Sequence, residues 1–166
     1  MTTKHTVNAF FMSLIMGVCS SLASAHGDED HGKTVFGEPG KAAEVQRTLD
    51  ITMGDNMRFV PDRLDIKQGE TVRIRLKNTG SMAHEFVLGT DAGIAEHAEM
   101  MKKMPDMRHV DASSARAEPG QTVEIIWQFS EAGNFVFACL IPGHFEAGMR
   151  GTVVVLASKT SINVVK

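Results

Sequence analysis

Residues 139–149 read Cys-Leu-Ile-Pro-Gly-His-Phe-Glu-Ala-Gly-Met, which places three soft or borderline metal donors in one short stretch. The proline and glycines of this stretch allow the chain to curl, so Cys139, His144 and Met149 can face one point. Residues 134–139 alternate in the manner of a strand, which aims the Cys139 side chain toward one face of a sheet. The stretch therefore predicts a strand that delivers a thiolate, followed by a loop that returns to it.

A thiolate, two imidazoles and a thioether together form the donor set of a type 1, or blue, copper site. The second imidazole has to come from another part of the chain. His84 is the candidate, because it follows a predicted turn and begins a predicted strand whose end can meet the cysteine loop. Zinc also binds imidazole and thiolate, but zinc sites rarely recruit a methionine thioether. We therefore predict one copper ion held by His84, Cys139, His144 and Met149.

Short strands separated by turn residues account for most of the remaining chain. The clearest are residues 71–78 and 122–129, where apolar and mostly polar residues alternate. Weaker strands are predicted at residues 45–53, 63–66, 84–88, 134–139 and 152–156. Such a series is typical of an antiparallel sandwich or barrel. Residues 91–107 instead have the Ala, Glu, Met and Lys content of a helix inserted between two strands and ending near Pro105.

The beginning of the chain has the pattern of a secretory signal peptide. An apolar run at residues 7–19 is followed by Ala-Ser-Ala at 23–25, and the run is shorter than the roughly 20 residues that span a bilayer. We expect cleavage after Ala25, a periplasmic location and no stable membrane insertion of the mature chain. Residues 26–44 are polar and Gly-rich, which predicts a flexible leader. Residues 45–166 then form one domain, with the helical insert at about 91–110.

Charge and cysteine content narrow the function further. The net charge is −3 and no basic run is present, which argues against a nucleic-acid partner. After removal of the signal peptide Cys139 is the single remaining cysteine, so no internal disulfide can form. A lone thiol in an oxidising compartment has to be buried, covalently used or bound to a metal. This requirement agrees with the predicted copper site.

These features resemble the cupredoxin family over about residues 45–156. The likeness lies in 59–61 (Phe-Val-Pro), 69–72 (Gly-Glu-Thr-Val), 82–86 (Met-Ala-His-Glu-Phe) and the Cys-x4-His-x4-Met loop. The acidic, histidine-bearing leader and the Met-rich insert resemble the periplasmic copper-tolerance cupredoxins of the CopI type. The resemblance implies an all-β, Greek-key cupredoxin sandwich with a protective copper-binding role. Glu85 departs from the Asn that electron-carrier cupredoxins usually place there to brace the ligand loops.

The insert and the leader carry further donors to copper. The insert contributes His97, Met100, Met101, Met104, Met107 and His109, and the leader contributes His26 and His31. The first four recur at helical spacing, which is typical of an amphipathic helix that packs on the sandwich. No Leu, Ile, Val or Phe occurs between residues 95 and 108, which leaves an accessory Cu(I) site as the alternative. The leader is either a solvated linker or a weak additional Cu(II) site.

Two functions fit this donor set. The extra Met and His donors favour copper tolerance, by sequestering or redox handling of periplasmic copper. The alternative is an electron carrier that passes electrons to a respiratory protein partner through His144, for which the type 1 site alone suffices. An oxidase or nitrite reductase would need further copper centres, typically built from His-x-His pairs, and the sequence has none. No catalytic triad, paired carboxylates or phosphate-binding loop stands out either, so we predict no catalytic residues.

Overall fold

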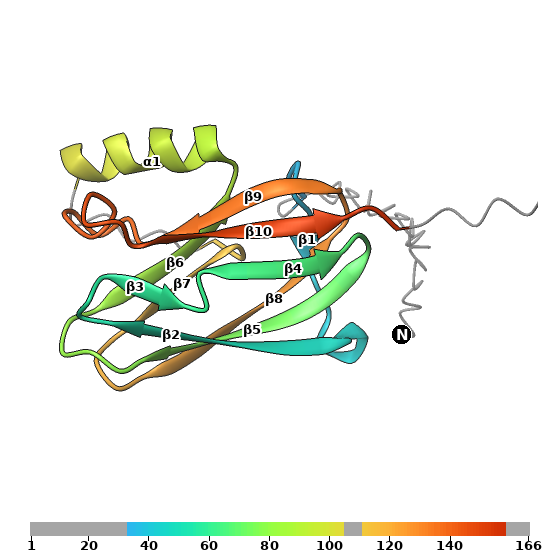
Figure 1. Cartoon of the computed structure of the whole chain (residues 1–166), viewed down its shortest axis with the longest axis horizontal. Coiled ribbons are helices and arrows are strands. Elements are labelled where there is room, and N and C mark those ends of the chain that lie inside the picture. Colours follow the sequence, from blue (N-terminus) through green and yellow to red (C-terminus); the bar gives the residue numbers. More distant parts are fainter. Residues whose placement is uncertain (1–32, 105–110, 159–166) are drawn as a thin grey trace, which may run out of the picture.

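The computed structural model of the chain describes residues 33–104 and 111–158, and its strands form two facing sheets (Figure 1). In spatial order, the first sheet contains β1 (Glu38–Pro39), β8 (Thr122–Phe129), β5 (Glu70–Asn78), β2 (Arg47–Gly54) and β3 (Arg58–Val60). The second contains β4 (Arg63–Lys67), β10 (Arg150–Leu156), β9 (Gly133–Ala138), β6 (His84–Gly89) and β7 (Ser114–Ala117). This arrangement confirms the predicted all-β sandwich.

Two strand pairs run parallel, which corrects the expectation of a purely antiparallel sandwich. β2 pairs with β5 and β4 pairs with β10 in parallel, whereas the other pairs are antiparallel. Parallel neighbours need a crossover connection. For β2 and β5 that connection includes β4, which belongs to the second sheet. The two sheets are therefore linked through the chain as well as through their packed faces.

The seven predicted strands correspond to β2, β4, β5, β6, β8, β9 and β10, with ends that differ by at most two residues. Three strands were not predicted, namely β1, β3 and β7. Each is only two to four residues long, which is too short for a period-two pattern to be recognised. Their pairing partners, rather than their own composition, decide that they are strands.

An aromatic cluster fills the core beneath the ends of β6 and β9. The ring centroids of Phe86 and Phe137 lie 4.9 Å apart, and Phe59 lies 6.0 and 5.0 Å from them. Phe86 and Phe137 are two residues away from His84 and Cys139 along their strands. Because side chains two apart in a strand share a face, the same packing that buries the rings points these two polar side chains inward.

Part of the expected leader belongs to the folded domain, which corrects the flexible assignment for residues 33–44. Phe36 is only 8% exposed, and its ring lies 5.4 Å from that of Trp127. The indole Nε1–H of Trp127 donates to the Phe36 carbonyl at 3.4 Å, and β1 pairs with β8. A short 3-10 helix follows at Ala42–Glu44. Burial of one large apolar side chain thus holds this segment. The predicted signal peptide and residues 26–32 lie outside the described residues.

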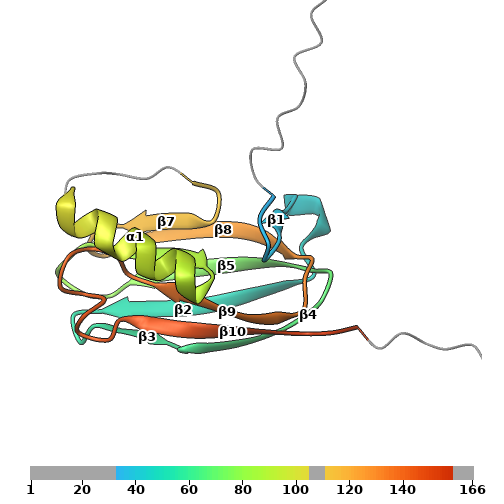
Figure 2. The ribbon, with the colours of Figure 1, turned by 90° about the horizontal axis from the view of Figure 1, so that it is seen from above.

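The predicted helical insert is confirmed as α1 (Asp91–Lys103), which follows β6 and precedes β7 in the chain and is seen from above in Figure 2. Its N-cap is Thr90, whose hydroxyl accepts a hydrogen bond from the Gly93 N–H at 3.1 Å. Ile94, Ala98 and Met101 are buried against a satellite cluster that β6 and β9 supply. The helix thus packs on the outer face of the second sheet. Within the described ranges, none of the helices combines the length and the apolar composition that crossing a membrane requires.

Candidate metal centre

Three side chains from distant parts of the chain converge at one end of the sandwich. His84 begins β6, Cys139 directly follows β9, and His144 lies in the loop that joins β9 to β10. One potential ligand atom from each lies within 4.8 Å of the other two. The Sγ of Cys139 is 3.3 Å from the Nδ1 of His144, and the two imidazole centroids are 5.1 Å apart. A thiolate and two imidazoles at such spacing can bind a single ion.

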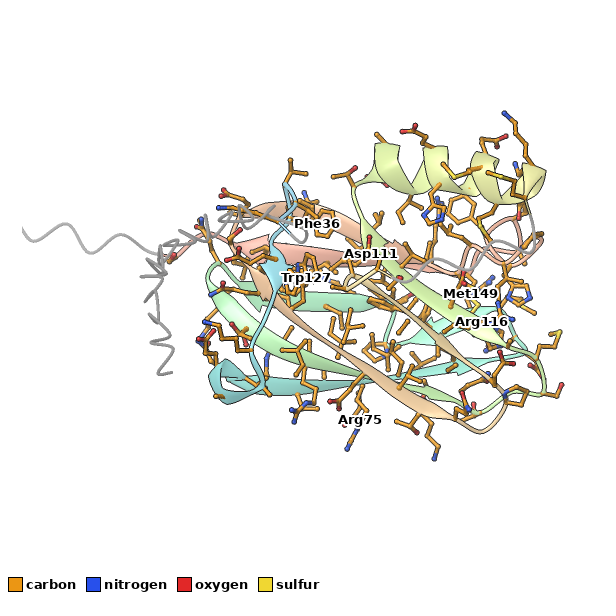
Figure 3. All side chains as sticks on the ribbon, turned by 180° about the vertical axis from the view of Figure 1, so that it is seen from behind. Phe36, Arg75, Asp111, Arg116, Trp127 and Met149 are labelled. Atoms are coloured by element: carbon orange, nitrogen blue, oxygen red, sulfur yellow. The ribbon has the colours of Figure 1, made fainter. Side chains whose placement is uncertain are left out.

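Main-chain hydrogen bonds hold Met149 next to Cys139 and His144. The Cys139 N–H donates to the Met149 carbonyl at 3.0 Å, and the Met149 N–H donates to the His144 carbonyl at 3.0 Å. Its side chain is fully buried at the end of the sandwich that also carries Arg116 (Figure 3). The loop therefore closes on itself with the Met149 side chain buried. Its thioether is a candidate for the weak fourth donor that a type 1 copper site would use.

Local hydrogen bonds and two glycines shape the ligand loop. Gly143 and Gly148 have φ values of 89° and 93°, which residues with a Cβ adopt only at a cost. The Gly148 N–H donates to the Phe145 carbonyl at 2.9 Å. The Arg58 guanidinium of β3 donates through Nη1 to the Ala147 carbonyl at 2.7 Å. This long-range hydrogen bond ties the ligand loop to the first sheet, and sequence analysis did not predict it.

Asn78 at the end of β5 braces the turn that precedes His84. Its fully buried amide Nδ2 donates to the Met82 carbonyl at 2.7 Å and to the Ala117 carbonyl at 2.9 Å. Its Oδ1 accepts from the Gly80 N–H at 2.9 Å. In the sequence Asn78 looks like an ordinary turn residue, and nothing in its neighbours reveals that it links this turn to β7.

Glu85, which replaces the usual Asn, contacts the centre through its main chain. Its backbone N–H donates to the Cys139 Sγ at 3.3 Å. Its carboxylate is nearly buried and lies 3.9 Å from the Arg116 guanidinium. The hydrogen bond to sulfur therefore does not require an Asn side chain at this position.

Burial controls the protonation of the donors. It raises the pKa of the Cys139 thiol to about 11, against the opposing effect of the Glu85 and Ile141 N–H groups. It also lowers the pKa values of His84 and His144, and the nearby His84 adds to the lowering for His144. Without metal the cluster is thus a neutral thiol beside two neutral imidazoles. Metal binding has to displace the thiol proton.

The donors fit a copper ion. Among the residues that the structure describes, both ring nitrogens of His84 are buried without a hydrogen-bond partner. Asp55 Oδ1 is 3.7 Å from the Nε2 of His84, which is longer than a hydrogen bond. Buried polar atoms are normally paired, so an unpaired ring nitrogen beside a thiol is best explained as a metal ligand. A cysteine, two histidines and a buried methionine are the soft set that copper prefers.

The structure describes four of the eight predicted accessory donors, all of them on α1 or at its C-terminal end. On α1, Met101 is 3% exposed and packs on the sheet, which agrees with the amphipathic-helix interpretation. Met100 and Met104 are 38% and 42% exposed and can reach solvent, and His97 is partly buried. The remaining predicted donors lie outside the described residues, namely Met107, His109, His26 and His31.

Comparisons with known proteins agree with this geometry and with the predicted resemblance. A copper-resistant cuproprotein CopI from Rubrivivax gelatinosus is 47% identical over 152 residues, covering 85% of this chain and 92% of that protein. The CopI of Pseudomonas aeruginosa is 36% identical, covering 86% of this chain and 93% of that protein. The solved structure of auracyanin A, a "blue" copper protein from Chloroflexus aurantiacus, has a TM-score of 0.54 at 27% identity. That match covers 66% of this chain and 98% of auracyanin A.

A family match covers the whole region that carries the site. The family described as "Copper binding proteins, plastocyanin/azurin family" matches residues 45–156, which include both sheets' main strands, α1 and the ligand loop. The chain therefore belongs to the plastocyanin/azurin family of copper binding proteins, the cupredoxins.

Proposed function

We propose that this chain is a periplasmic type 1 copper protein that contributes to copper tolerance by sequestering copper or cycling its redox state. The ligands are His84, Cys139, His144 and Met149. The observation that carries the proposal is the convergence of the Cys139 thiol with two neutral imidazoles, one of them with unpartnered buried nitrogens. The relatives named copper-resistant cuproproteins support the biological role, since each alignment covers most of both chains.

The protein's own groups prepare the site for a metal. Copper, when bound, supplies one-electron chemistry. Cys139 gives up its proton on binding, and the Glu85 N–H then faces a thiolate that it stabilises by a hydrogen bond. The main strands and the closed loop hold the donors in place before an ion binds. The full burial of His84 and Cys139 keeps water away from the thiolate.

The alternative function is electron transfer, and one observation favours it. His144 is partly exposed, whereas His84, Cys139 and Met149 are fully buried. His144 is thus the ligand through which an electron could pass between the ion and a redox protein partner. The two roles share one site and differ in whether a dedicated partner exists. In neither role does the chain act as an enzyme.

The proposed export agrees with the tolerance role and is itself testable. Residues 1–25 are proposed to direct the chain to the periplasm and to be removed there. Cell fractionation followed by mass determination should find a periplasmic protein that begins at His26. A full-length protein in the cytoplasmic fraction would contradict this proposal.

Copper addition to the purified mature protein tests the site. Cu(II) should produce an intense visible band from charge transfer between thiolate and copper, with at least one ion bound per chain. Cys139→Ser should lose the band, because the hydroxyl is a poor donor to copper. The matched control is Ser113→Ala, which alters a buried hydroxyl outside the cluster. A colourless wild type with no bound copper would refute the proposal.

Growth of a deletion strain separates the two functions. We expect the strain to be sensitive to copper and to be rescued by the wild-type gene but not by Cys139→Ser. Respiration without added copper should be normal. Normal growth on copper together with a respiratory defect would favour the electron carrier.

A further inference from the structure

Asp55, in the turn between β2 and β3, holds the turn that leads into His84. Its carboxylate accepts the Ser81 N–H at 3.0 Å through Oδ1 and 2.8 Å through Oδ2, and the Met82 N–H at 3.2 Å. The Ser81 hydroxyl donates to Oδ2 at 2.7 Å. A Cβ at Gly80 would collide with this carboxylate, so the glycine allows its close approach.

The same carboxylate faces the outer nitrogen of the buried imidazole. Oδ1 lies 3.7 Å from the Nε2 of His84, which is completely buried. Because the two nitrogens of an imidazole point in different directions, an Nε2 that lies toward Asp55 leaves Nδ1 as the nitrogen that can bind an ion. A carboxylate beside one ring nitrogen favours the tautomer that carries hydrogen there, and the other nitrogen then keeps the lone pair that a metal needs.

We propose that Asp55 is a positioning residue of the metal centre, which fixes the turn before His84, orients its ring through Nε2 and adds negative charge close to the ion. This inference rests on the proposed copper site and goes beyond its four ligands. The added charge stabilises Cu(II) more than Cu(I), because the interaction grows with the charge of the ion. Asp55 thereby sets both the affinity for copper and its reduction potential.

Asp55→Asn tests the charge, with Asp65→Asn as the matched control. Asp65 lies on β4, is paired with Arg63 and does not belong to the cluster. We expect Asp55→Asn to weaken Cu(II) binding by roughly 10-fold to 100-fold, the usual effect of losing a partner of a metal-bound histidine. Cu(I) binding should weaken less. Each tenfold change in the ratio of the two affinities raises the potential by about 59 mV, whereas Asp65→Asn should leave both quantities unchanged.

Ser81→Ala separates the electrostatic role from a purely structural one. This variant loses the hydroxyl hydrogen bond to Oδ2 but keeps the carboxylate and its charge. We expect its metal-free form to unfold at lower denaturant concentration while the copper potential stays at the wild-type value. A potential that shifts as much as in Asp55→Asn would overturn the electrostatic part of the inference.

The metal-free protein gives a readout that does not depend on copper. Long-range proton–nitrogen NMR correlations should show His84 as one tautomer with hydrogen on Nε2 in the wild type and in Asp65→Asn. In Asp55→Ala the tautomer with hydrogen on Nδ1 should become populated, and an unchanged spectrum would overturn the inference. If the wild type binds copper but Asp55→Asn behaves like Asp65→Asn, the inference about Asp55 is wrong and the proposed function still stands. If the wild type binds no copper, the proposed function fails.

Discussion

The backbone N–H of Glu85 donates a 3.3 Å hydrogen bond to the sulfur of Cys139, joining the start of β6 to the residue that follows β9. The two residues lie outside the paired part of β6 and β9. That ladder begins with Val87 opposite Ala138 and continues with Leu88 opposite Phe137. The contact therefore arises where the two strands leave the ladder. Hydrogen bonds to a metal-bound sulfur tune the electronic properties of the site, and here the main chain provides one.

The raised pKa of Cys139 predicts a loss of stability at alkaline pH. The unfolded thiol has its ordinary pKa of 9.0, whereas burial raises the folded value to about 11. Since the unfolded state ionises first, the stability contributed by the neutral buried thiol is complete below pH 9 and is lost as pH rises through 11. Urea denaturation of metal-free wild type and Cys139→Ser should show an excess loss of ~2 kcal/mol in the wild type over this window. Parallel pH profiles would contradict the prediction.

Met149→Leu should keep copper bound but raise its reduction potential. The leucine fills the buried volume at small cost in stability, whereas the axial sulfur that donates weakly to Cu(II) is lost. Voltammetry of the copper-loaded variant measures the shift, and the visible band confirms that the other ligands remain. An unchanged or lower potential would show that the thioether does not interact with the ion.

Removal of the Arg58 guanidinium should loosen the ligand loop. Arg58→Met keeps an unbranched side chain but loses the hydrogen bond to the Ala147 carbonyl. We expect the metal-free protein to lose about 1 kcal/mol, the usual net value of one such bond, and copper to dissociate faster. The control is Arg63→Met, which removes an exposed ion pair with Asp65 of little energetic value. Equal rates of copper dissociation in the two variants would show that the hydrogen bond from Arg58 to Ala147 does not hold the ligand loop.

Asn78→Ala should destabilise the turn before His84 more severely. The substitution leaves the Met82 and Ala117 carbonyls without their amide donor, and Ala117 itself is buried. Because an unsatisfied buried acceptor costs about 1–3 kcal/mol, we expect the free energy of unfolding to fall by about that amount in urea denaturation, chiefly through the Ala117 carbonyl. A smaller loss would indicate that the turn rearranges around the missing amide.

The exposed methionines of α1 allow a test of the accessory Cu(I) site. If Met100 and Met104 bind a second ion, the wild type should bind more than one Cu(I) per chain, and replacing both by leucine should remove the excess. Met101→Leu is the control, because this buried side chain packs on the sheet. If the wild type binds only one Cu(I) per chain, the spacing of the methionines reflects the packing of the helix alone.

The local spacing of residues in the sequence was sufficient to predict much of this protein's structure. The strand before Cys139, the turn residues of the loop, the histidine at 144 and the helix at 91–103 all depend on neighbours within about ten residues. Periodicity and ligand spacing report such features directly. His84 was predicted as a ligand from its position at the start of a strand and from a family resemblance. Only the fold brings its ring close to the Cys139 thiol.

Tertiary structure decided the features that depend on contacts between distant segments. Phe36 joins the core because the indole of Trp127, 91 residues away, provides a surface for its ring and a donor for its carbonyl. Arg58 and Ala147 are 89 residues apart, and Asp55 and Ser81 are 26 apart. These pairs have no local signature, since a hydrogen bond between distant residues exists only after two packed sheets have brought its donor and acceptor together.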